Sequence, residues 1–157
     1  MPKITPCLWF DTQGEEAAEF YTSIFPNSRI VDVARYGEAG PRDAGTVMVV
    51  KFELDGQELV ALNGGPEFTF DEAISFQIDC ADQEEVDRYS EALTDGGEQG
   101  PCGWVKDRFG LSWQVIPTVL PKLLGDSDRE RAGRAMKAML AMKKLDIAEL
   151  KRAAAGE

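Results

Sequence analysis

The side chains that could do chemistry in this sequence are carboxylates, hydroxyls, amides, thiols and tryptophans, because its 157 residues include no histidine. Histidine is the commonest metal ligand in proteins and the side chain that titrates nearest neutral pH. Its absence excludes Ser-His-Asp and Cys-His catalysis and histidine-ligated zinc or iron. Cys7, Cys80 and Cys102 have no CxxC spacing, so we expect reduced thiols rather than a zinc site or disulfides.

Three segments of the chain alternate between apolar residues and a mixed set of polar and aromatic residues. Successive side chains of a strand point to opposite faces, so each segment presents one set to each face of a sheet. The apolar sets are predicted to pack beneath helices: Ile4, Pro6, Leu8 and Phe10, then Ile74, Phe76, Ile78 and Cys80, then Leu111, Trp113 and Val115. The mixed sets are predicted to line the opposite face: Thr5, Cys7 and Trp9, then Ser75, Gln77 and Asp79, then Ser112 and Gln114.

The mixed face has two interpretations. Aromatic walls with a few neutral hydrogen-bonding groups suit a pocket for an uncharged or weakly polar organic ligand. A solvated sheet face would also alternate, but a tryptophan such as Trp9 is unusual on such a face. We therefore take the pocket as the working hypothesis.

The elements that must position these residues occur twice along the chain. Each half has the order strand, helix and three strands, a βαβββ module with one uncovered sheet face, and pairing two such modules can bury that face or shape it into a cleft. The modules span residues 1–65 and 74–117 of a single domain, 1–121, to which a helical extension, 122–157, belongs. The predicted strands are 4–10, 29–36, 46–54, 58–63, 74–80, one near Glu98, 104–106 and 111–116, and the predicted helices are 15–25, 82–93, 119–124 and one or two within 128–155, with a break near Asp146.

The charge distribution limits the partners. The net charge of −11 argues against nucleic acid and anionic membrane, although the extension carries nine lysines and arginines against six acids. This basic extension either docks on an acidic face of its own or a partner subunit, or is a solvated helix. Its Met136, Met139, Leu140 and Met142 are typical of core or dimer packing rather than of a ligand-binding methionine cluster.

The apolar runs are too short to cross a membrane and residues 1–10 do not resemble a signal peptide, so we expect a cytoplasmic protein.

The paired modules and several motifs resemble the vicinal oxygen chelate superfamily, and within it the PhnB-like, or 3-demethylubiquinone-9 3-methyltransferase-like, group. The similar segments are Ile4 to Phe10, Glu19 to Tyr21, Ile74 to Phe76, Cys102 to Gln114 and Met142 to Ala148. This resemblance implies an α+β fold of paired βαβββ modules, the glyoxalase/bleomycin resistance/dioxygenase fold, followed by C-terminal helices.

The resemblance also indicates where a metal would bind. In metal-dependent members, such as glyoxalase I and the extradiol dioxygenases, histidine and glutamate ligands project from the open face of the sheet. The matching positions here, to within one residue, are Thr5, Ala61, Ser75 and Gln114, which offer no histidine and no carboxylate. We therefore expect no metal and no other cofactor, because neutral oxygens bind a divalent ion only weakly.

The resemblance to metal-free members, such as bleomycin-binding resistance proteins that hold flat aromatic compounds in a dimer cleft, implies a homodimer that binds a small organic molecule. Ala61, Cys102 and Trp104 complete the predicted ligand-contacting set. A first alternative is a non-metal enzyme, a methyltransferase or isomerase acting on quinone-like or other small substrates, with Asp79 or Cys102 doing acid-base or nucleophilic work. The turn 11–14 is not the glycine-rich loop of the usual S-adenosylmethionine enzymes. A second alternative is an interaction module whose C-terminal helices bind a partner.

Overall fold

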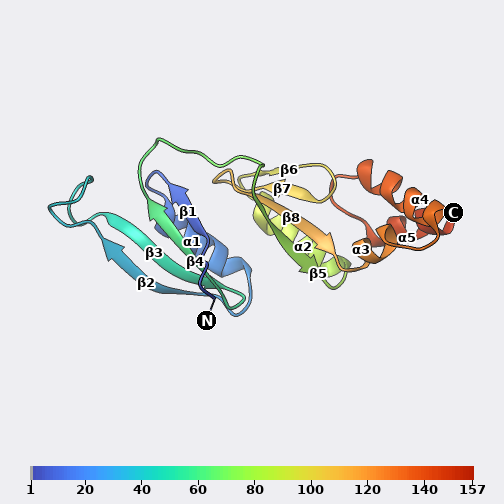
Figure 1. Ribbon diagram of the computed structural model, residues 1–157, viewed down its shortest axis with the longest axis horizontal. Helices are drawn as coiled ribbons and strands as arrows, with labels where there is room; N and C mark the ends of the chain where they lie inside the picture. Colours follow the sequence, from blue (N-terminus) through green and yellow to red (C-terminus); the bar gives the residue numbers. More distant parts are fainter. Residues whose placement is uncertain (1) are drawn as a thin grey trace. The chain divides into compact units, whose positions relative to one another are not determined.

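The computed structural model describes residues 2–157, which divide into two compact units, one up to Phe70 and one from Asp71 to Glu157. Each unit contains a four-stranded sheet with a helix packed on one of its faces (Figure 1). The predicted α+β fold of two βαβββ modules is confirmed. Among the described residues, none of the helices has the length and apolar character needed to cross a membrane. Met1, the first residue of the segment compared with signal peptides, lies outside the described residues.

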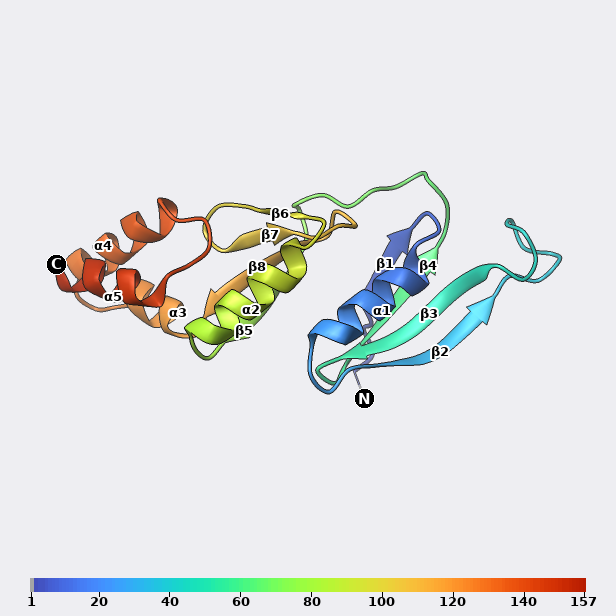
Figure 2. The ribbon, with the colours of Figure 1, turned by 180° about the vertical axis from the view of Figure 1, so that it is seen from behind.

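The first unit has the strand order β1-β4-β3-β2, in which β1 runs parallel to β4 and the other pairs are antiparallel. Helix α1 packs against β3 and β4 and buries Ala17, Ala18 and Tyr21, whose spacing places them on one helical face (Figure 2). The elements are β1 (Cys7–Phe10), α1 (Gly14–Ile24), β2 (Arg29–Arg35), β3 (Val47–Leu54) and β4 (Gln57–Asn63).

Asn63, at the end of β4, fixes the start of α1. Its side chain is buried and accepts a hydrogen bond from the Gly14 backbone N–H at 2.7 Å, while its amide group donates to the carbonyl oxygens of Thr12 and Val47. A Cβ on residue 14 would lie 2.7 Å from the Asn63 Oδ1, so this contact requires glycine. One buried amide thus joins three segments of the first unit and satisfies an N–H that the helix leaves unpaired.

The second unit repeats this topology with the order β5-β8-β7-β6, and α2 packs on the same sheet. Asp82 caps α2 as predicted, because its Oδ1 accepts a hydrogen bond from the Glu85 N–H at 2.9 Å. The elements are β5 (Ser75–Cys80), α2 (Gln83–Thr94), β6 (Glu98–Gln99), β7 (Trp104–Lys106) and β8 (Ser112–Pro117).

The C-terminal extension forms α3 (Val119–Leu124), α4 (Arg129–Leu140) and α5 (Ile147–Ala155), and belongs to the second unit. Leu120, Leu145 and Leu150 form its core, against which Met139 and Met142 pack. Asp146 caps α5, so the predicted break near this residue is confirmed.

The basic extension docks on the acidic helix α2 of its own unit. The Gln83 side chain accepts a hydrogen bond from the Ile147 N–H at 2.8 Å and donates one to the Leu145 carbonyl at 3.0 Å. The Lys144 Nζ lies 2.8 Å from the Asp87 Oδ1. These contacts show the extension docked on an acidic helix of its own subunit rather than standing free as a solvated helix.

Replacing Lys144 with glutamine is expected to raise the pKa of Asp87. Hydrogen bonds from Lys144 and Gln83 hold the pKa of this carboxyl below its ordinary value of 3.8. The pKa of Asp87 is lower in the folded protein than in the unfolded chain. The Asp87–Lys144 pair therefore stabilises the fold at pH values above the ordinary pKa, and this stabilisation is lost as the pH falls through the folded-state pKa. Carboxyl-carbon NMR titration measures the change. Lys143→Gln is the matched control, and an Asp87 titration that Lys144→Gln left unaltered would show that the pair does not form.

Two predictions of burial are wrong. Ile4 and Ile74 were assigned to the apolar sets beneath the helices, but they are 84% and 63% exposed. The cause is the position of the strand starts, since β1 begins at Cys7 and β5 begins at Ser75. Each isoleucine precedes its strand, so sheet pairing does not hold its side chain against the helix.

Candidate functional site

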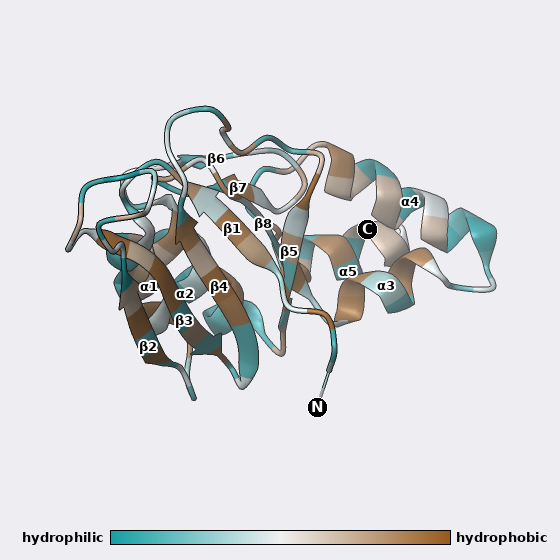
Figure 3. Ribbon diagram, turned by 60° about the vertical axis from the view of Figure 1, so that its left-hand side comes forward, coloured by the Kyte–Doolittle hydropathy of each residue, from teal (hydrophilic) through white to brown (hydrophobic). Residues whose placement is uncertain are grey.

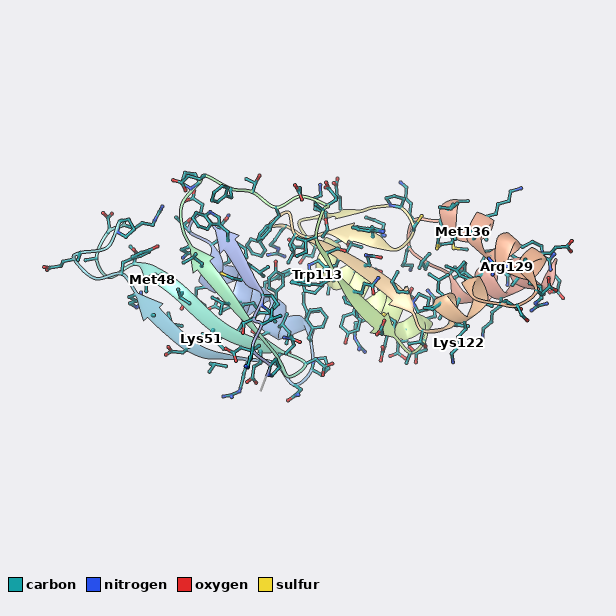
Figure 4. The ribbon with its side chains drawn as sticks, in the orientation of Figure 1. Met48, Lys51, Trp113, Lys122, Arg129 and Met136 are labelled. Carbon is teal, nitrogen blue, oxygen red and sulfur yellow. The ribbon has the colours of Figure 1, made fainter. Side chains whose placement is uncertain are left out.

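The face of each sheet that its helix leaves uncovered is called here the open face. In the first unit this face is apolar where β3 and β4 run beside Trp9 (Figure 3), and charged farther along the sheet, where the register places Asp32, Glu53 and Glu58 on it. Lys51, labelled in Figure 4, is an exposed charge on it. The strand register places on this face Cys7 beside Val60, Trp9 beside Leu62, Val49 beside Leu62 and Lys51 beside Val60.

Trp9 is held in place by the segment that follows β4. Its indole N–H donates to the Gly65 carbonyl at 2.8 Å, and its ring meets the Phe68 ring edge-on at a centroid distance of 4.9 Å. A Cβ on Gly64 would lie 2.4 Å from the indole, so the ring can cross this position only because it is glycine. Phe68 is 64% exposed and forms, with Trp9, an aromatic surface that the sequence analysis did not include.

Thr5 and Cys7 occupy the start of the same segment. Thr5 is exposed and precedes β1, whereas Cys7 lies within β1 on the open face. Partial burial raises the pKa of the Cys7 thiol, which keeps it protonated at neutral pH. Cys7 therefore contributes a small apolar side chain to the open face and is not an activated nucleophile.

Ala61 was predicted to lie on the open face, and this prediction is wrong by one residue, because Ala61 lies on the helix-covered face. It pairs with Leu8 and Val50, is 1% exposed, and approaches the start of α1 at Gly14. Its neighbours Val60 and Leu62 occupy the open-face positions of β4 instead. The prediction located the correct strand but missed its parity, because apolar residues occupy both faces of β4.

The open face of the second unit carries neutral amides and hydroxyls at its centre. Gln114 lies at its centre, donating a hydrogen bond to the Ser75 Oγ at 2.9 Å and accepting one from the Gln77 Nε2 at 3.5 Å. The predicted residues on this face, taken from the strand register, are Ser75, Gln77, Asp79, Trp104, Ser112 and Gln114. The opposite face carries Trp113, which is buried as predicted.

Lys106 is a cation on this face that the sequence analysis missed. It pairs with Ser112 in the β7–β8 register, forms an ion pair with Glu72, and lies 4.0 Å from a Glu98 carboxylate oxygen. Its contact with Glu72 raises the pKa of Lys106 and lowers the pKa of Glu72, so both groups stay charged at neutral pH. Alternation from Trp104 along β7 was the signal that could have identified it.

Cys102 does not lie on a strand of either open face. It lies in the turn before β7, with a left-handed backbone φ of 57°, and its N–H donates to the Met142 carbonyl at 2.9 Å. The adjacent Gly103 N–H donates to the Lys143 carbonyl at 2.8 Å. The structure therefore places Cys102 where the C-terminal extension docks, apart from the strand positions that include Trp104.

The residues at the metal positions of the superfamily do not fit a metal ion. Thr5 is exposed before β1, Ala61 has no donor atom and faces the helix, and Ser75 and Gln114 are hydrogen-bonded to each other. Across residues 2–157, no group of three or more histidine, cysteine, aspartate or glutamate side chains is arranged to hold a metal. The open faces offer apolar and aromatic side chains, neutral amides and hydroxyls, and the charged groups of Lys51, Asp79 and Lys106.

Residues 2–116 match the sequence profile of the 3-demethylubiquinone-9 3-methyltransferase family. The PhnB protein from Bacillus cereus is 37% identical, with a TM-score of 0.66, and the match covers 74% of this chain and 100% of that chain. Protein PA1353 from Pseudomonas aeruginosa is 23% identical, with a TM-score of 0.59, over 74% of this chain and 98% of that chain. The fosfomycin resistance protein FosX from Listeria monocytogenes is 18% identical, with a TM-score of 0.55, over 80% of this chain and 98% of that chain. A search of curated proteins found no match.

The family match ends at residue 116, before α3 begins. The Bacillus cereus protein is covered over its whole length by 74% of this chain. The family match thus covers the two βαβββ modules, and α3 to α5 lie beyond it, so the resemblance of Met142 to Ala148 stays a prediction.

Proposed function

Because the chain belongs to the 3-demethylubiquinone-9 3-methyltransferase family, the PhnB-like group of the vicinal oxygen chelate superfamily, we propose that it binds a small organic molecule on its open sheet faces. In this proposal the ligand is held without a resident metal ion, by a homodimer in the cytoplasm. The homodimer is proposed from the resemblance to metal-free members that bind their ligands in a dimer cleft. The nature of the ligand is proposed from the residues of the two faces.

The chemical difference between the two open faces is the observation that supports this proposal most strongly. The first face offers Trp9, Val60 and Leu62 beside the exposed ring of Phe68. The second offers the hydrogen-bonded amides of Gln77 and Gln114. Apolar surface provides most of the binding free energy in small-molecule sites, while a few polar groups orient the ligand. The first face therefore suits a flat, weakly polar compound, and the second suits a compound with a carbonyl or hydroxyl group that its amides can bind.

Methyl transfer, which the family name describes, has less support from the fold of this chain. The usual S-adenosylmethionine enzymes use a doubly wound parallel sheet with a glycine-rich loop after its first strand. Here each sheet has four strands of mixed direction, and β1 is followed by a turn that leads to Gly14 and Asn63. We therefore propose binding as the primary function, with turnover as the alternative.

Ligand binding is tested by screening small aromatic and quinone-like compounds for thermal stabilisation of EDTA-treated protein. A compound bound on the first open face is expected to lose at least about tenfold in affinity with Trp9→Ala, which removes a ring contact. A compound bound on the second open face is expected to lose as much with Gln114→Ala, which removes the central amide. Affinities are measured by isothermal titration on folded variants. Ile4→Ala, an exposed position outside both sheets, is the control. If both site variants bound every hit as tightly as the wild type, the open faces would not be the binding site.

A further inference from the structure

Helix α4 carries an exposed stripe on a part of the chain beyond the family match. Its apolar members Met136 and Leu140 are 41% and 62% exposed, although other residues of the same helix pack against the core. Arg129 and Gly133 complete the stripe, because residues three, four, seven and eleven positions apart share one face of a helix. Met136 and Arg129 project from α4 in Figure 4. These four residues are called here the α4 stripe.

Gly133 has no packing role within the subunit. A Cβ built at this position meets no atom within 4 Å. Glycine inside a helix costs about 1 kcal/mol relative to alanine, so the monomer would be more stable with alanine at this position. A glycine does allow a second helix to approach closely, since the distance between packed helices depends on the side chains at their contact.

The α4 stripe is complementary to itself in size. Its four positions are symmetric about the midpoint between Arg134 and Ala135. In an antiparallel pair of α4 helices related by a two-fold axis, Gly133 lies opposite the partner's Met136, and Leu140 lies opposite the partner's Arg129. The small residue meets the large one, and the aliphatic part of arginine covers the leucine.

The flank of the stripe is complementary in charge. Glu130 and Lys137 are exposed on the same side of α4, and neither takes part in an ion pair within residues 2–157. The same antiparallel arrangement brings Glu130 close to the partner's Lys137, and symmetry repeats this contact. We therefore propose that a second copy of this chain docks on the α4 stripe through antiparallel pairing of the two α4 helices.

The proposal rests on the homodimer of the proposed function, and it does not depend on which ligand that homodimer binds. Helix α4 has 12 residues, a length of about 18 Å, so the contact is shorter than a standard protein interface. We expect reversible association in the micromolar range or weaker. Sedimentation velocity over a concentration series that reaches the high micromolar range measures it directly.

Four variants test the contact, all at exposed positions, where substitutions are expected to leave the fold intact. Met136→Glu combined with Leu140→Glu is expected to abolish association, because it places carboxylates in the apolar centre. Glu130→Lys and Lys137→Glu are each expected to weaken association by about two- to tenfold, because each creates two like-charge contacts. The double variant carrying both reversals is expected to associate like the wild type, since it recreates the opposite-charge contacts with the signs exchanged.

Ile4→Glu, an exposed isoleucine in the first unit, is the matched control and is expected to leave association unchanged. Wild-type dimers that persist in the Met136→Glu, Leu140→Glu variant would overturn the α4 contact and leave the homodimer in place. A wild-type protein that remained monomeric throughout the series would overturn both the α4 contact and the homodimer of the proposed function, and the ligand screen would then test binding by the monomer. Failure of the two charge reversals to rescue each other would contradict the antiparallel arrangement.

Discussion

Replacing Asp107 with alanine is expected to lower the free energy of unfolding by about 3–4 kcal/mol. The Asp107 carboxylate is buried in the turn between β7 and β8. Its Oδ1 accepts hydrogen bonds from the Phe109 and Leu111 N–H groups at 2.9 and 3.1 Å, and its Oδ2 accepts one from the Trp113 indole N–H at 2.9 Å. Alanine would remove the acceptor of these three hydrogen bonds. Chemical denaturation measures the loss.

A double-mutant cycle separates the indole contact from the turn. Trp113→Phe removes the indole N–H, so Asp107→Ala should cost less in a Trp113→Phe background than in the wild type. Asp95→Ala is the control, because Asp95 forms a surface ion pair with Arg108 and its loss is expected to cost less than about 1 kcal/mol. Equal losses for the two aspartates would contradict the role of Asp107.

The second large effect is expected at Gly97, where alanine should cost about 3 kcal/mol. The residue is exposed, and a surface substitution would ordinarily be tolerated. A Cβ at this position, however, would lie 2.1 Å from the Lys106 carbonyl oxygen and 2.9 Å from the Asp107 backbone. These are backbone atoms at the end of β7, so the clash with the added Cβ can be relieved only if the strand that carries Trp104 and Lys106 moves. Thermal and chemical denaturation measure the loss.

Gly37 provides the matched control for this substitution. It is also exposed, but a Cβ built there meets no atom within 4 Å. Gly37→Ala is therefore expected to change the stability by less than about 0.5 kcal/mol. If Gly97→Ala were as well tolerated as Gly37→Ala, the close approach of residue 97 to β7 would be wrong.

Local patterns in the sequence predict most of the fold. The period-two alternation around Trp9 and around Gln114 correctly assigns these side chains to the open faces, because pleating alone determines parity within a strand. The N-cap at Asp82 and the break at Asp146 follow from side chains that bond to backbone N–H groups a few residues away. These features depend on short-range geometry, which the residues themselves specify.

Long-range geometry determines what the sequence did not predict. Phe68 reaches Trp9 only because the segment after β4 folds back on β1, and Ala61 has its parity set by pairing with Leu8. Cys102 leaves the candidate site because the chain near Met142 docks on it. Each of these outcomes requires knowledge of a contact that no local pattern encodes.

The central claim, that the open sheet faces bind a weakly polar organic ligand without a metal, is tested most directly by NMR of isotope-labelled, EDTA-treated protein. A compound that stabilises the protein is added while the indole N–H signal of Trp9 and the side-chain amide signals of Gln77 and Gln114 are followed. Saturable shifts are expected for the Trp9 indole signal or for the Gln77 and Gln114 amide signals, according to the open face that the compound occupies, while the indole signal of Trp113, buried on the helix-covered face, changes little. Stabilising compounds that left the Trp9 and Gln114 signals unchanged, or that bound only after a divalent metal was added, would contradict it.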